Sequence, residues 1–307
     1  MPAMPASALM ILASFLFATM GVCVKLAGAY YDTGEIVMYR GLTGMAMLFL
    51  LTRARGQTLR TPVPALHFWR SLSGVIALSL WFFSLGKLPL ATAVTLNYMS
   101  SIWMALFLVG GAIMLGGSRI DPRLIASVLV GFAGVALVLR PTIDRDQFWH
   151  GLAGLCSGVL SATAYLQVTA LGRSGEPEYR IVFYFSMGGA IAGLLTTLAL
   201  KAIGQGGSQH GHSATGIALL LAVGLLATVA QLMMTRAYAR GKTLVNASLQ
   251  YSGILFSFVY GVLLFSDPVT LWAVAGITLI VAAGLSATLL RAKTTPVDSQ
   301  NHAITES

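Results

Sequence analysis

The sequence predicts an all-α integral membrane protein built from ten transmembrane helices. Of its 307 residues, 56% are hydrophobic and only 9% are charged, whereas a soluble domain has about 25% charged residues. The hydrophobic residues also occur in continuous runs, and about 20 such residues let a helix cross the hydrocarbon core of a bilayer. Transmembrane β-strands would instead alternate polar and apolar residues over about 10 positions. We therefore expect helices, which satisfy their own backbone hydrogen bonds in lipid.

Ten apolar segments, separated by short polar or turn-forming segments, are the expected spans. They are residues 6–27, 35–52, 68–86, 91–114, 124–140, 151–171, 179–200, 215–238, 244–265 and 269–290. No cationic residue precedes the first of them, so we expect a retained span rather than a cleaved signal peptide. The polar segment 294–307 is expected to be a disordered cytoplasmic tail.

Lys and Arg residues are distributed unevenly between the two sides of the predicted membrane protein. Alternating spans place 13 of the 19 cations, Arg70 among them, on the side that holds both termini, and six, Arg40 among them, on the other. Short cytoplasmic loops carry the excess of Lys and Arg. We therefore predict a multi-pass protein of the plasma (inner) membrane with both termini in the cytoplasm. This topology accounts for the net charge of +9, and we expect no nucleic-acid partner.

Two apolar segments that carry polar residues resemble each other. Aligning Leu96-Asn97-Tyr98 with Leu249-Gln250-Tyr251 gives an offset of 153 residues. The chain then divides into a first five-helix repeat at 6–140 and a second at 151–290. Because five is odd, the second repeat enters the membrane in the inverted orientation. Inverted repeats are typical of secondary transporters, in which the substrate site lies near the bilayer midplane between the repeats.

Polar side chains inside the spans are expected to face a central cavity between the repeats, because a polar group exposed to lipid is costly. In the ninth span, a helical spacing places five residues on one face: Asn246, Gln250, Gly253, Ser257 and Tyr260. The corresponding face of the fourth span contains Asn97 and Ser100. The eighth span adds Gln231 and the sixth adds Tyr165.

Several motifs resemble the drug/metabolite transporter superfamily, EamA type. They are LGKLPLATAVTLNYMSSIWMALF at 85–107, YRG at 39–41, and LQYSGILFSFVYGVLLFSDPVTLWAVAGITLIVAAG at 249–284. The resemblance implies ten helices around a central cavity and the export or uptake of small metabolites. Many family members have a proline about three residues after the tyrosine of spans four and nine. Ser101 and Ile254 stand there in this chain, so its sequence does not predict a kink at either place.

Eight residues are candidates for binding a substrate: Asn97, Gln250, Gln231, Tyr165, Trp81, Asn246, Ser100 and Arg40. The amides either bind the substrate or join neighbouring helices, and the aromatic rings either stack on it or pack. Arg40 either binds a substrate carboxylate or lies at the membrane interface paired with Glu35. Arg236 and Glu35 are the candidate gate residues, with a role as a positive-inside anchor as the alternative for Arg236.

The sequence lacks the motifs of several other classes. It contains no GxxxxGK[ST], GxSxG or HExxH, so we expect neither ATP-driven transport nor an enzyme. The two histidines of SQHGHS at 208–213 are too few to hold a metal, and no cofactor is expected. The carboxylates fall in loops, at span ends or in the tail, which favours facilitated transport or exchange over proton coupling.

The predicted function is secondary transport, by alternating access, of a small polar or zwitterionic organic metabolite such as an amino acid. A nucleoside-like or S-adenosylmethionine-like solute is the alternative substrate, because aromatic stacking surfaces are available. A channel or a scaffold protein is the alternative from another class. The expected partners are a small-molecule substrate and the lipid bilayer, and the protein is either a monomer or a homodimer.

Overall fold

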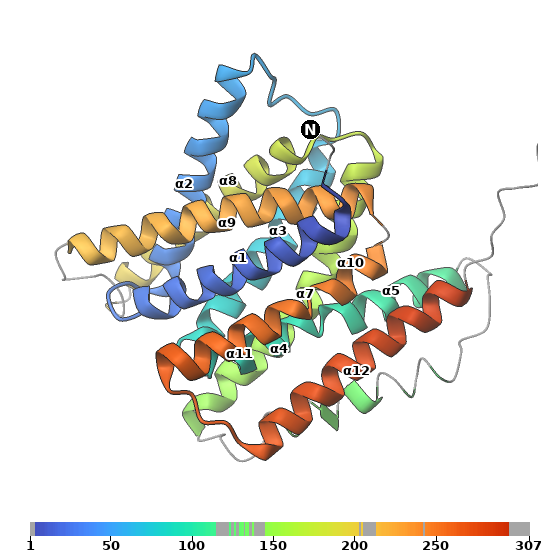
Figure 1. Cartoon of the computed structure of the whole chain (residues 1–307). Coiled ribbons are helices and arrows are strands. Elements are labelled where there is room, and N and C mark those ends of the chain that lie inside the picture. The colour runs from blue at the N-terminus through green and yellow to red at the C-terminus, as the bar shows by residue number, and fades with distance from the viewer. Residues whose placement is uncertain are drawn as a thin grey trace, which may run out of the picture.

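The described part of the chain is a bundle of α-helices. The computed structural model describes residues 4–114, 145–202, 204, 213–241 and 243–294, with isolated positions between 123 and 137, and within these residues no strand occurs (Figure 1). The helices are α1 (Ala6–Ala27), α2 (Thr33–Ala54), α3 (Pro64–Leu85), α4 (Leu90–Tyr98), α5 (Ser100–Met114), α7 (Arg145–Arg173), α8 (Glu178–Ala202), α9 (Ala214–Arg240), α10 (Thr243–Leu249), α11 (Ser252–Phe265) and α12 (Leu271–Thr294). The predicted span 124–140 is described only at isolated positions, and the tail from 295 lies outside the described residues.

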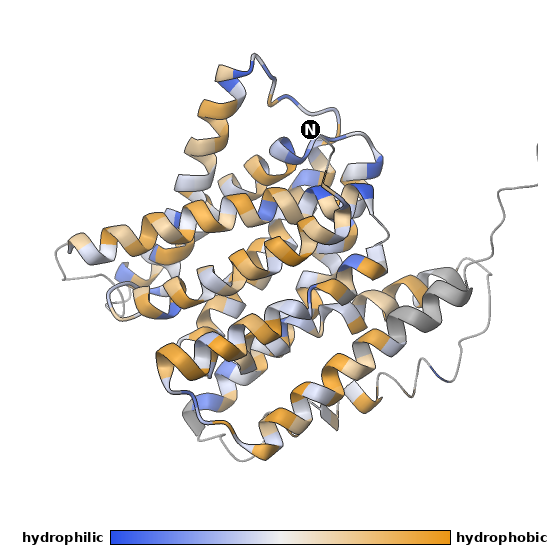
Figure 2. Cartoon of the chain, viewed as in Figure 1, coloured by the Kyte–Doolittle hydropathy of each residue, from blue (hydrophilic) through white to orange (hydrophobic). Residues whose placement is uncertain are grey.

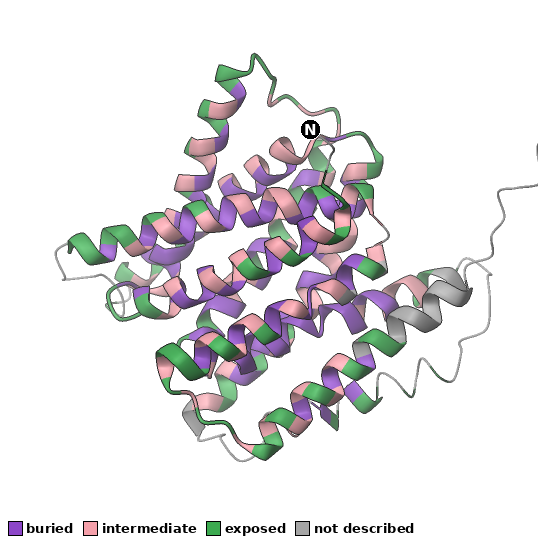
Figure 3. Ribbon diagram, viewed as in Figure 1, coloured by how far each residue is buried: buried purple, intermediate pink, exposed green. Residues whose placement is uncertain are grey.

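The surface of the bundle is apolar, which fits a lipid environment. Eight helical stretches of the described chain are long and apolar enough to cross a membrane, and α12 contains a shorter apolar segment, Leu271–Ala283. Large apolar side chains such as those of Leu195, Leu255 and Leu263 are exposed, and both hydrophobic and exposed residues recur along the outer helices (Figures 2 and 3). Soluble proteins rarely expose apolar surface of this extent. The all-α membrane fold predicted from composition is confirmed, and the number of ten helices stays a prediction.

Two of the spans are interrupted where the polar residues lie. The predicted span 91–114 turns at Met99, between α4 and α5, and the predicted span 244–265 turns at Gln250 and Tyr251, between α10 and α11. Neither turn contains a proline. Instead the backbone tightens: the amides of Ile102, Gly253 and Ile254 each bond to the carbonyl three residues earlier, as in a 3₁₀ turn. Such irregular backbone is tolerated at membrane depth because protein covers it.

Helices from before residue 114 pack against helices from after residue 145. The most extensive packing is that of α2 with α8, α3 with α7, and α1 with α9. A Cβ atom at Gly41 would lie 2.3 Å from the backbone nitrogen of Ala190, and one at Gly193 would lie 2.4 Å from that of Met38. Only glycine at these positions allows α2 and α8 to approach so closely. This packing brings α2, α3, α7, α8 and α9 around a common interior, while α5 and α12 lie together at the periphery.

Polar contacts join separate segments of the chain at two places in the bundle. At one end, the carboxylate of Asp267 lies 3.5 Å from Lys25 Nζ and accepts a 3.0 Å hydrogen bond from the backbone N–H of Leu90. Near the start of α3, the carboxylate of Glu176 lies 3.0 Å from His67 Nε2. It also accepts hydrogen bonds from Arg180 at 3.1 Å and from Thr61 at 3.0 Å.

Candidate functional site

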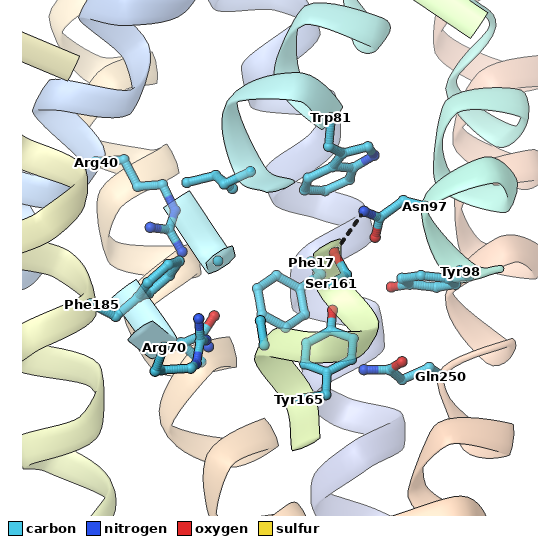
Figure 4. Close-up of a pocket in the computed structure, with 14 residues that line it drawn as sticks. Phe17, Arg40, Arg70, Trp81, Asn97, Tyr98, Ser161, Tyr165, Phe185 and Gln250 are labelled. Atoms are coloured by element: carbon cyan, nitrogen blue, oxygen red, sulfur yellow. Dashed lines mark hydrogen bonds between the residues drawn. The ribbon is translucent and has the colours of Figure 1, made fainter. Parts of the chain in front are cut away.

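A narrow cavity lies in the interior where these helices meet. Its volume is about 60 Å³. It is lined by Phe17, Arg40, Arg70, Gly74, Leu78, Trp81, Asn97, Tyr98, Ser161, Ala164, Tyr165, Phe185, Gln231 and Gln250 (Figure 4). The lining residues come from α1, α2, α3, α4, α7, α8 and α9 and from the turn between α10 and α11. Both interrupted spans therefore contribute to one cavity.

Two arginines and a phenylalanine form one side of the cavity. The guanidinium carbons of Arg40 on α2 and Arg70 on α3 lie 5.0 Å and 4.3 Å from the ring centre of Phe185 on α8. Arg40 is only 3% exposed and Arg70 only 2%. Contact with an aromatic face stabilises a guanidinium, but it leaves N–H groups unused. Arg40 Nε, Arg70 Nε and Arg70 Nη1 have no hydrogen-bond partner in the structure.

Gly74 makes room for the position of Arg70. A Cβ atom at Gly74 would lie 1.9 Å from Arg70 Nη1 and 3.0 Å from Phe185 Cε2. Gly74 follows Arg70 by four residues on α3, so the two lie on the same helix face. The absence of a side chain at Gly74 lets the guanidinium fold along its own helix and reach Phe185. The sequence of α3 thus fixes where this cation lies.

The cavity carries positive charge without a balancing carboxylate among its described lining residues. Five carboxylates of the described chain have other partners. Asp32 and Glu35 form the capping box of α2, Glu176 binds His67 and Arg180, Glu178 binds Arg236, and Asp267 binds Lys25. Because Arg is always protonated in proteins, the two buried cations make the cavity attractive to an anionic group.

Amide side chains lie across the cavity from the arginines (Figure 4). Asn97 Nδ2 donates hydrogen bonds to Ser157 Oγ at 3.0 Å and Ser161 Oγ at 3.1 Å on α7. Gln250 Nε2 donates to Met234 Sδ at 3.6 Å, and its Oε1 has no partner. The buried indole N–H of Trp81 is also without one. Gln250 Oε1 and the Trp81 indole N–H are therefore available to a polar solute, whereas Asn97 Nδ2 already joins α4 to α7.

Aromatic rings complete the wall. Phe17, Trp81, Tyr98 and Tyr165 line the cavity together with Phe185. Tyr165 stacks on Tyr238 of α9, with ring centres 5.4 Å apart and planes 18° apart. This stacking fixes the Tyr165 ring, because offset-stacked pairs gain energy beyond their area burial. The cavity thus combines cations, neutral polar groups and flat apolar surfaces.

The structure brings six of the eight sequence-predicted binding residues to this cavity. They are Arg40, Trp81, Asn97, Tyr165, Gln231 and Gln250. The sequence alternative that pairs Arg40 with Glu35 stays a prediction. Arg40 packs on Phe185, and Glu35 Oε2 accepts a 3.2 Å hydrogen bond from the backbone N–H of Asp32.

Ser100 and Asn246 are not among the cavity residues. The turn at Met99 changes the helical phase, and the buried Ser100 follows it. Asn246 precedes the turn at Gln250, and its Nδ2 donates a 2.5 Å hydrogen bond to the carbonyl of Ala237. That carbonyl lies in the last turn of α9 and also accepts a 2.8 Å hydrogen bond from the backbone N–H of Gly241. The single polar face predicted for the ninth span stays a prediction, because Asn246 and Gln250 keep a helical hydrogen bond of 3.1 Å between them.

The candidate gate residues lie away from the cavity. Arg236 Nε donates a 2.7 Å hydrogen bond to Glu178 Oε1, which joins α9 to the start of α8. The Arg236 side chain is 44% exposed. Glu35 is buried in the first turn of α2. Neither residue lines the cavity described here, and a role in gating stays a prediction for both.

Sequence reasoning missed Arg70 as a cavity residue. Arg70 was counted among the cations of the cytoplasmic side, yet it is buried and packs on Phe185. Its position inside the predicted span 68–86 was the available signal, because a charge within a span faces protein or water rather than lipid. Phe185 and Phe17 gave no comparable signal, since aromatic residues in spans usually pack.

Comparison with known proteins identifies the family. A model of the EamA-like transporter family matches residues 4–140. The pseudopaline exporter CntI of Pseudomonas aeruginosa is 32% identical over 278 residues, which cover 90% of this chain and 93% of the exporter. A riboflavin transporter of Rhizobium johnstonii is 29% identical over 199 residues, 64% of this chain and 62% of that protein.

The fold also matches a solved crystal structure, with a TM-score of 0.67 and 20% sequence identity over 93% of this chain and 98% of the other. At that identity the match bears on the fold alone. Together with the long apolar helices, the relatives show a transporter rather than an enzyme. The chain is a multi-pass membrane protein that belongs to the EamA-like transporter family.

Proposed function

We propose that this protein is a secondary transporter of an organic anion that carries at least one carboxylate, with Arg40 and Arg70 as the anion-binding residues. The observation that carries the proposal is the pair of buried guanidinium groups that share Phe185 and have unused N–H donors. Arginine is well suited to bind a carboxylate, because its planar donors match both oxygens. A bound anion also offsets the cost of burying the two charges.

The charge of the cavity narrows the substrate classes predicted from the sequence. No carboxylate is among the described lining residues, so the ammonium group of a zwitterion finds only neutral acceptors such as Gln250 Oε1. A cationic solute of the S-adenosylmethionine type is disfavoured by repulsion from Arg40 and Arg70. Within the predicted class of polar organic metabolites, we therefore favour solutes with net negative charge.

The size of the cavity favours transport by alternating access. A ligand pocket usually has a volume of about 300–1,000 Å³, and this cavity has about 60 Å³. The helices around it must therefore separate to admit a metabolite. We further propose that the segments 6–140 and 151–290 are the inverted repeats whose relative movement opens the cavity to one side and then to the other.

Export is the proposed direction, supported by the name of the CntI relative, which matches over most of both chains. We keep the plasma membrane and cytoplasmic termini as part of the proposal. When the two cavity cations Arg40 and Arg70 are left out, 12 Lys and Arg residues remain on the predicted cytoplasmic side and five on the other. The positive-inside bias is therefore preserved.

Counterflow in proteoliposomes tests the proposal. The purified protein is reconstituted and loaded with a mono-, di- or tricarboxylate, and entry of the labelled solute is compared with that of the matched amide analogue. The proposal predicts saturable counterflow of acids and much slower counterflow of amides. Arg40→Gln should reduce it, while Arg53→Gln should not, because Arg53 packs on Phe49 outside the cavity. Equal counterflow of acids and amides would overturn the proposal.

A neutral flat solute is a second candidate, because five aromatic residues line the cavity and one relative is named a riboflavin transporter. Trp81 and Tyr165 would stack on such a solute. Saturable riboflavin counterflow that survives Arg40→Gln but not Trp81→Ala would favour this second candidate. Flux that neither saturates nor shows counterflow would instead favour a channel.

A further inference from the structure

A second hollow lies on the outside of the bundle, between the end of α2, the start of α1 and the last turns of α9. It is a groove of about 350 Å³ lined by Met4, Leu9, Leu51, Arg55, Val229, Leu232, Met233, Arg236 and Arg240. Beside the groove, the C-terminal part of α2 projects away from the other helices (Figure 1). Phe49 and Leu50 there are 46% and 67% exposed. The groove shares no lining residue with the central cavity.

The groove has a basic part and an apolar part. Three of its residues are arginines, and the other six are apolar. Arg55 is the C-cap of α2, and Arg240 is the last residue of α9. Helix ends of a membrane-spanning bundle lie near the headgroup layer of the bilayer. The apolar residues Leu9, Leu51 and Leu232 lie further from the helix ends and so at the depth of acyl chains.

The three cations are only partly neutralised. Arg236 is paired with Glu178. Arg55 and Arg240 form no ion pair with any residue of the described chain, and both are exposed. One carboxylate, Glu178, interacts with both Arg236 and Arg240, so net positive charge remains from the three arginines at the headgroup end of the groove. A zwitterionic lipid headgroup has no net charge with which to balance these arginines, whereas an anionic headgroup has a net negative charge.

We propose that this groove binds an anionic phospholipid, with its phosphate on Arg55 and Arg240 and one acyl chain along Leu51, Leu232 and Met233. The site also has a consequence for α2, which carries both Arg55 and the cavity residue Arg40. A lipid held between α2 and α9 keeps the end of α2 separated from α9. Anionic lipid then favours the conformation in which these helices diverge, and it alters the transport rate without entering the cavity.

The binding test uses the full-length protein in a neutral detergent and titrates it with phosphatidylglycerol or phosphatidylcholine, with bound lipid counted by native mass spectrometry. Phosphatidylglycerol should bind more tightly, and this preference should weaken at high salt. The double variant Arg55→Gln/Arg240→Gln should bind it about 30-fold more weakly, since each arginine near an anionic headgroup contributes about a factor of five. Arg53→Gln is the matched control, because Arg53 lies on the same helix end but outside the groove.

A transport assay separates lipid binding from a general loss of structure. The double variant should show the same counterflow as the unmodified protein in phosphatidylcholine vesicles and should lose the response to added phosphatidylglycerol. Equal binding of the two lipids, or an unchanged preference in the double variant, would overturn the proposal. So would displacement of phosphatidylglycerol by a transported carboxylate, because that result would place substrate rather than lipid in the groove.

Discussion

Arg40 and Arg70 come from different helices but lie against the same ring, that of Phe185, with guanidinium carbons 5.0 Å and 4.3 Å from its centre. Two like charges buried near each other oppose folding unless something compensates them. Contact with the ring provides part of that compensation. Under the proposed function a bound anion supplies the rest, so the proposal links the stability of the protein to the presence of its substrate.

The first prediction concerns Arg70→Gln. Counterflow of a carboxylate should fall about 10- to 100-fold, from the loss of ~1.5–3 kcal/mol in charged hydrogen bonding. The midpoint temperature of thermal unfolding in detergent should rise in the absence of substrate, because one uncompensated buried charge is removed. Arg53→Gln should change neither value. Retention of full counterflow by Arg70→Gln would contradict the assignment of this residue to the anion site.

The second prediction concerns Gly74→Ala. The new methyl group would meet the tip of Arg70, a flexible side chain that can turn aside, rather than backbone. We therefore expect little loss of thermal stability but a rise of at least about tenfold in the concentration of carboxylate that half-saturates counterflow, because the guanidinium leaves its place on Phe185. Gly110→Ala is the control, since a Cβ at Gly110 meets nothing within 4 Å. An unaffected half-saturation in Gly74→Ala would argue against this placement of Arg70.

The third prediction concerns the pH dependence of stability, through Glu176 in the connection between α7 and α8. Burial by itself raises the pKa of Glu176, but hydrogen bonds from His67, Arg180 and Thr61 outweigh it and hold the pKa below its ordinary value of 4.5. A depressed folded-state pKa contributes stability that is complete above the unfolded-state pKa and is lost as pH falls through the folded-state pKa.

Glu176→Gln should therefore lower the midpoint temperature of unfolding near neutral pH. The difference in midpoint between the variant and the unmodified protein should shrink as the pH falls below about 4.5. Thermal unfolding in detergent at a series of pH values measures both effects. A constant gap between variant and unmodified protein across that range would show that the ionisation of Glu176 adds nothing to stability.

The fourth prediction compares the two members of the Lys25–Asp267 pair. Asp267→Ala should destabilise the protein more than Lys25→Gln does. The aspartate accepts a hydrogen bond from the first N–H of α4, which follows Pro89 and has no side-chain cap of its own. Loss of a cap costs about 0.5–2 kcal/mol, whereas a partly exposed ion pair contributes ~0–1 kcal/mol. Thermal unfolding of both variants gives the order, and equal destabilisation would mean that the cap contributes nothing.

The sequence indicated six cavity residues because polar side chains in an apolar span face the protein interior or water rather than lipid. It did not predict the positions of Ser100 and Asn246. Ser100 follows the turn at Met99, which interrupts the helical spacing from Asn97. Asn246 keeps its helical spacing to Gln250, but its Nδ2 bonds to the carbonyl of Ala237. Because no proline marks the turn at Met99 or the turn at Gln250, the sequence did not predict these turns.

The sequence by itself determined the class of this protein, because composition and the length of apolar runs decide whether lipid or water is the solvent. It also determined which residues bear chemistry, since so few polar groups lie within the spans. Only the tertiary structure decided that Arg70 faces the interior and shares Phe185 with Arg40. That placement depends on the packing of α2 and α3 with α8 and on the space above Gly74. Contacts between segments more than 100 residues apart arise from packing, which a local pattern of residues does not encode.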